Sequence, residues 1–134
     1  SKMRQPIEAP FKEPLIADWS EVGLGLVAVV FAFLGHPLGH VVAVNGALCH
    51  GAYALRLTTR FSTPLWWWDV ACNVCMLLHV NSHACAQPFC AGVTALACSA
   101  WKFNNAASEY DPAVHASLVQ FPLFLGLSHF TSQC

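Results

Sequence analysis

Charged residues are scarce in this chain. Asp, Glu, Lys and Arg together make up 10% of its 134 residues, whereas hydrophobic residues make up 56%. Soluble proteins have roughly a quarter of their residues charged. The surplus apolar surface needs lipid to cover it, so the composition predicts an integral membrane protein rather than a soluble domain.

Basic clusters are also missing, since the formal net charge is −1 and no Lys or Arg residues gather in a patch. A nucleic-acid partner is therefore excluded, because its phosphates would have to meet clustered positive charges. The first residues show no secretory signal pattern. An internal signal anchor, or a transit peptide that has already been removed, would then direct the chain to its membrane.

Local catalytic motifs are absent. The chain has no glycine-rich phosphate loop, no Ser-His-Asp arrangement, no carboxylate pair and no C-x-x-C-H haem attachment site. It has seven cysteines, an odd number that rules out complete intrachain pairing. Cys85 and Cys134 are predicted to be exposed. The others lie in apolar runs and are predicted to be mostly inert packing thiols: Cys49, Cys72, Cys75, Cys90 and Cys98.

Proline and glycine divide the apolar sequence into helical segments. Gly35 ends the first segment, and Pro37, Pro64 and Pro112 fit the first turns of later helices. Residues 1–17 are predicted to be an irregular polar arm, followed by an all-α helical domain over 18–134. The predicted helices cover about 19–34, 37–58, 64–83, 88–103 and 112–130, with Pro122 as a kink or break in the last one.

The positions of the cations indicate five membrane crossings, because every Lys and Arg then lies on one side, as the positive-inside rule expects. These cations are Lys2, Arg4, Lys12, Arg56, Arg60 and Lys102. The tryptophans fall at the same boundary: Trp19, Trp66, Trp67, Trp68 and Trp101. The N-terminus would face the cytosol, matrix or stroma. Four crossings, with the first segment on the membrane surface, remain an alternative.

Histidine is what the chain has in excess, with seven residues against six Lys and Arg. The five-crossing topology sorts the histidines into two levels. Two of them, His50 and His115, share the inner half of the membrane with Asp69, the acid placed well inside a predicted span. The outer level contains His36, His40, His79, His83 and His129.

The outer histidines favour a tetrapyrrole, because a transmembrane imidazole can serve as axial ligand to haem iron or chlorophyll magnesium. His40 and His79 are predicted to be a facing pair at one depth, with His36, His83 and His129 as further candidates. We therefore predict a small subunit of a larger membrane complex that carries chlorophyll or b-type haem. Its partners would be the lipid bilayer and other membrane subunits or further copies of itself. A purely structural subunit is the plainer alternative.

The inner level points to a second hypothesis. Gly46-Ala47-Leu48-Cys49-His50-Gly51, followed by Leu65-Trp66-Trp67-Trp68-Asp69, resembles motifs of the CREST superfamily of membrane hydrolases, which includes alkaline ceramidases and adiponectin-receptor relatives. The resemblance covers about thirty residues. It implies an intramembrane zinc-dependent hydrolase in which His50 binds the metal and Asp69 assists the metal-bound water. His115 is the third candidate ligand.

A third hypothesis uses soft donors on one helix. Cys75, His79 and His83 are spaced i, i+4 and i+8, and Cys72 and Met76 lie close to them in sequence. Thiolate, thioether and imidazole groups are suitable ligands for copper(I). The sequence therefore leaves three ligand classes open: a tetrapyrrole, zinc and copper.

Overall fold

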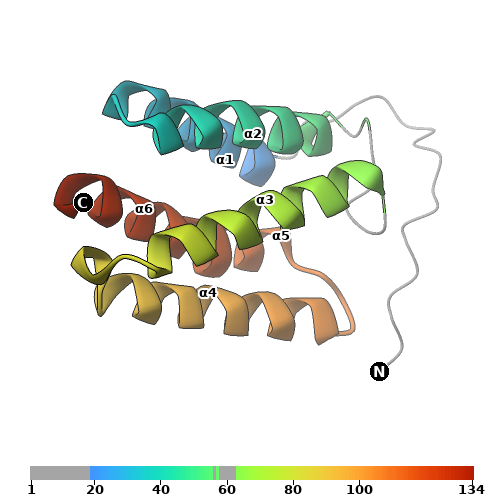
Figure 1. The fold of residues 1–134 in the computed structure, drawn as a ribbon. Helices are drawn as coiled ribbons and strands as arrows, with labels where there is room; N and C mark the ends of the chain where they lie inside the picture. The colour runs from blue at the N-terminus through green and yellow to red at the C-terminus, as the bar shows by residue number, and fades with distance from the viewer. Residues whose placement is uncertain (1–18, 56, 58–62) are drawn as a thin grey trace. The chain divides into compact units, whose positions relative to one another are not determined.

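The computed structural model describes residues 19–55, 57 and 63–134. Over these residues the chain is all-α, with five helices and no strand. Figure 1 draws these helices as coiled ribbons. The all-α class is thus confirmed. The predicted irregular arm over 1–17 and the predicted end of the second helix at 58 lie outside the described residues.

The helices begin close to the residues at which the sequence places their starts. The first consists of α1 (Trp19–Val30) and a 3-10 extension, η1 (Phe31–Leu34), and the second is α2 (Pro37–Ala54). The next are α3 (Pro64–Asn81), a short 3-10 turn η2 (Ala84–Ala86), and α4 (Phe89–Ala106). The last helix is continuous through α5 (Pro112–Val114), η3 (His115–Gln120) and α6 (Phe121–Gln133).

Local chemistry explains several of these boundaries. Gly35 has a φ of 69°, a left-handed conformation that glycine adopts readily and that ends the first helix. Pro37 occupies the first turn of α2, where the Leu38 amide donates to Nδ1 of His36 at 3.1 Å. The amide of Ala113 likewise donates to the Asp111 side chain at 2.9 Å.

The described residues divide into two compact units, one ending at Cys72 and the other over Asn73–Cys134. In the first unit α1 and α2 lie side by side as an antiparallel hairpin (Figure 1). Their backbones approach closely at two glycines. A Cβ on Gly46 would overlap Cβ of Ala28, and a Cβ on Gly39 would overlap the carbonyl oxygen of Phe31.

In the second unit α4 packs beside α6 and η3. Gly126 permits this approach, because a Cβ there would lie 2.7 Å from Cγ2 of Val93. The predicted irregularity at Pro122 takes the form of a widened turn rather than a break. The Phe121 amide donates to the carbonyl of Ala116, five residues back, which accommodates a proline that has no N–H to donate.

One helix in the described part of the chain, Pro112–Gln133, is long and apolar enough to cross a membrane by length and composition. Trp19–Leu34 is apolar but shorter. The structure therefore shows an all-α protein in which one described helix has the length and composition of a membrane span.

Candidate functional site

The predicted site residues are divided between the two units. His36, His40, His50 and Asp69 belong to the first unit. His79, His83, His115 and His129 belong to the second. Among the residues that the structure describes, no three His, Cys, Asp or Glu side chains form a group that could hold a metal ion. The predicted zinc ligands are divided in the same way, with His50 and Asp69 in the first unit and His115 in the second.

A buried pair of polar side chains lies within the α1–α2 hairpin. Nδ1 of His50 is 2.6 Å from Oε2 of Glu21, and the two residues are 3% and 2% exposed. The Tyr53 ring meets the imidazole edge-on at a centroid distance of 6.1 Å. Since a polar group in an apolar interior is costly without a partner, each of these two side chains makes the burial of the other tolerable.

Glu21 is a residue that the sequence analysis did not select, although the hairpin contains a signal for it. Glu21 lies 14 residues before Gly35, and His50 lies 14 residues after His36. In an antiparallel hairpin, positions equally far from the turn lie at the same level, because both helices rise equally per residue. Equal spacing from the turn would therefore have predicted Glu21 as the partner of His50.

His40 lies on a different face of α2. The His40 side chain is exposed. Three apolar residues on the same side of the helix are also exposed: Val41, Val44 and Leu48, whose exposed fractions are 52%, 71% and 58%. Their spacing places them on one side of the helix, opposite the buried Val42, Cys49 and His50. A single imidazole thus stands on an otherwise apolar surface.

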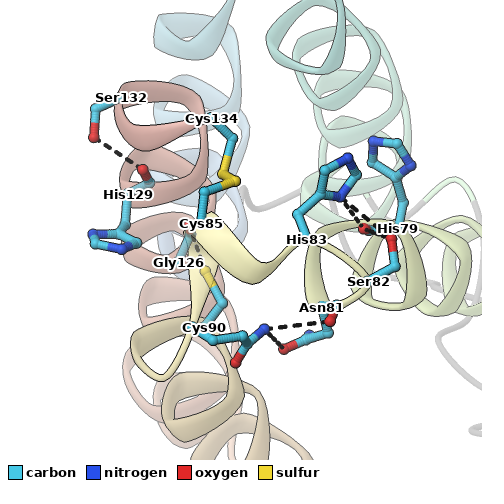
Figure 2. Close-up of a disulfide and its surroundings, with 11 residues drawn as sticks. His79, Asn81, Ser82, His83, Cys85, Cys90, Gly126, His129, Ser132 and Cys134 are labelled. Carbon is cyan, nitrogen blue, oxygen red and sulfur yellow. Dashed lines mark hydrogen bonds between the residues drawn. A yellow bond between two sulfur atoms is a disulfide. The ribbon is translucent and has the colours of Figure 1, made fainter.

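Cys85 and Cys134 are exposed, as predicted, but they are joined to each other in a disulfide (Figure 2). The bridge ties η2 to the end of α6.

Of the free cysteines, Cys49 and Cys90 are buried as packing thiols, and the Cys90 thiol donates to the Gly126 carbonyl at 3.3 Å. Cys75 and Cys98 are exposed.

The remaining histidines have local partners. His36 caps α2, as described above. His115 contacts the buried Gln120, with 3.2 Å between Nε2 of the two side chains. The His129 ring lies against Phe89 at a centroid distance of 4.7 Å. His79 and His83 form a pair, with ring centroids 4.8 Å apart.

Comparisons of the chain with protein-family models, with curated proteins and with solved structures give no match. Function must therefore be inferred from the side chains themselves. Three arrangements carry distinct chemistry: the buried Glu21–His50 pair, the exposed His40 on its apolar stripe, and the His79–His83 pair beside the disulfide.

Proposed function

We propose that this chain is a small integral membrane subunit that binds a tetrapyrrole, chlorophyll or b-type haem, through His40. The observation that carries the proposal is the exposed imidazole in the first turn of α2, at one end of an apolar helix face. Val44 and Leu48, one and two turns further along, provide a surface against which a flat macrocycle can lie.

In the proposed membrane location, the exposed His40 imidazole faces lipid. An unsatisfied polar group in hydrocarbon costs roughly 2–7 kcal/mol, depending on the reference state. Coordination of Nε2 to haem iron or chlorophyll magnesium removes that cost, and the macrocycle covers the neighbouring apolar side chains. One axial histidine suffices for one pigment. Because His40 and His79 belong to different compact units, the proposal uses His40 alone and not the pair.

Exposed apolar side chains support the membrane location. The exposed positions of the first helix include Leu26, Val30 and Phe33, large residues that lipid would cover. The continuous helix over Pro112–Gln133 has the length of a membrane span. We propose a topology of five crossings, with the N-terminus on the membrane side that carries every Lys and Arg.

The disulfide supports the same topology. In the five-crossing arrangement, the turn at Cys85 and the end of the chain at Cys134 lie together on the side without Lys or Arg. Disulfides persist in oxidising compartments. The side that carries every Lys and Arg would then face the cytosol, matrix or stroma. The disulfide side would face an oxidising compartment.

The proposal is tested on native protein purified in mild detergent. We expect Soret-region absorbance, at least a tenfold loss of bound pigment in His40→Ala, and recovery when free imidazole is added to His40→Gly. His36→Asn is the matched control, because asparagine keeps a side-chain acceptor for the helix cap. A native preparation with no pigment in an organic extract, or a His40→Ala variant that retains all of it, would contradict the proposal.

The Glu21–His50 pair favours zinc hydrolysis as a second candidate function. A histidine that binds a metal generally donates its other ring N–H to a carboxylate or carbonyl group, and the 2.6 Å contact at Nδ1 of His50 is of that kind. On this hypothesis His50→Ala and Asp69→Asn abolish both zinc content and hydrolysis of a lipid amide, while His40→Ala leaves both intact. Zinc content unchanged by both inner substitutions would exclude it.

A further inference from the structure

Two imidazoles meet where α3 ends. His79 lies in the last turn of α3, and His83 follows the helix and precedes η2. Their ring centroids are 4.8 Å apart with the planes inclined by 63°, and Figure 2 shows the rings side by side. Two imidazoles bound to one ion at ~2.1 Å, with a tetrahedral or square angle between them, have centroids about 4.5–5.2 Å apart. The observed separation falls within that range.

The hydrogen bonds of His83 define its tautomer. Nδ1 of His83 lies 2.8 Å from the carbonyl oxygen of His79 and 3.3 Å from Oγ of Ser82. A carbonyl oxygen can only accept, so Nδ1 carries the proton and donates it. In the neutral imidazole the lone pair is then on Nε2, which is the arrangement that protein ligands to metals use.

The surrounding structure holds both rings in place. Phe130, which is buried, meets the His79 ring at 5.8 Å and the His83 ring at 5.1 Å, both edge-on. The Cys85–Cys134 disulfide fixes the segment that follows His83 to the end of α6. All of these residues belong to the same compact unit, so the pair is held by one body.

A further contact fixes the helix end between the two histidines. Nδ2 of Asn81 donates to the Leu77 carbonyl at 2.9 Å and to Oγ1 of Thr94 in α4 at 3.0 Å. Gln87 in turn donates to Oδ1 of Asn81 at 3.1 Å. This network joins the last turn of α3 to α4, so the backbone that carries His79 does not have to be ordered when an ion arrives.

We infer that His79 and His83 form a binding site for one late divalent transition-metal ion of the Ni²⁺, Cu²⁺ or Zn²⁺ class. Imidazole nitrogen suits these ions, whereas Mg²⁺ and Ca²⁺ prefer carboxylate and carbonyl oxygen. His79 is exposed, so an ion and its remaining water ligands can reach the pair. This site uses other residues than His40 and stands independently of the pigment proposal.

The first test is calorimetric titration of the full-length protein in detergent with Ni²⁺ alone. We expect one ion per chain, no competition from Mg²⁺, and at least a tenfold weaker affinity in both His79→Ala and His83→Ala. His129→Ala is the matched control, because it removes another imidazole from the same unit and leaves the pair intact. Unchanged affinity in both pair variants, or the same loss in His129→Ala, would overturn the inference.

A spectroscopic test keeps the inference falsifiable if a pair variant fails to fold. We would record the Cu²⁺ electron paramagnetic resonance spectrum of a Cys75→Ser/Cys98→Ser protein, which lacks the two exposed thiols that could reduce the ion. Coupling to two equatorial imidazole nitrogens is the expected result. Coupling to one nitrogen or to none would overturn the two-histidine site.

Discussion

Oε2 of Glu21 lies 2.6 Å from Nδ1 of His50, and both side chains are buried in the hairpin of α1 and α2. The contact joins the first turn of one helix to the last turns of the other. It is a long-range contact, 29 residues apart in sequence, and fixes how the two helices align. Each of the two side chains gives the other a polar partner inside an apolar interior.

Glu21→Ala should destabilise the protein, because it leaves His50 buried without this partner. Removing one member of a buried pair costs about 3–5 kcal/mol of unfolding free energy. Unfolding in detergent, followed by circular dichroism, measures the change. Glu109→Ala, at an exposed acid, should fall within about 0.5 kcal/mol of wild type. Equal stability of the Glu21 and Glu109 variants would show that the buried contact contributes nothing.

Gly39→Ala should disturb the hairpin, because the new Cβ overlaps the backbone carbonyl of Phe31, which cannot rotate away as a side chain would. Forcing extra atoms into a packed site costs about 1–3 kcal/mol. Gly51→Ala in the same helix meets no atom within 4 Å and should stabilise by about 0.5–1 kcal/mol. The thermal unfolding midpoints of the two variants measure these effects. Midpoints that shift in the same direction in both variants would contradict the close approach of Gly39 to the Phe31 carbonyl.

Cys85→Ser should lower stability by removing the link between η2 and α6. With a sequence separation of 49 residues, the loss of chain constraint in the unfolded state corresponds to about 4 kcal/mol. Cys98→Ser, at an exposed free thiol, is the control and should leave stability unchanged. Chemical unfolding with and without reductant measures both. A wild-type protein that reductant does not weaken would refute the role of the bridge.

Asn104→Ala should loosen the connection between α4 and α5. The buried Asn104 side chain donates to the Asp111 carbonyl at 3.0 Å and accepts from the Asp111 amide at 3.0 Å. Leaving these backbone groups without their partner should cost about 1–3 kcal/mol. Asn105→Ala, at the next position, tests whether the effect is specific. Amide hydrogen exchange at Asp111 should accelerate only in the Asn104 variant. Unchanged exchange in that variant would show that the Asn104 side chain does not hold the Asp111 backbone.

Helix starts were predictable because they depend on chemistry within a few residues. Pro37, Pro64 and Pro112 each fit a first turn, where the missing N–H has no partner to lose, and Gly35 takes the left-handed conformation that ends a helix. Pro122 is predicted to be a kink or break in the last helix, and the helix is continuous there. Its outcome, a widened turn inside a continuous helix, depends on which upstream carbonyl the Phe121 amide reaches.

The sequence by itself determined the all-α class, the helix starts and the excess of histidine in an apolar chain, because composition and local backbone preferences act without distant contacts. Only the tertiary structure decided the partners: Glu21 for His50, Cys134 for Cys85, and Phe130 for the His79–His83 pair. Each of these contacts joins residues from different helices or turns. Their distances follow from how the helices pack, which periodicity along one segment does not specify.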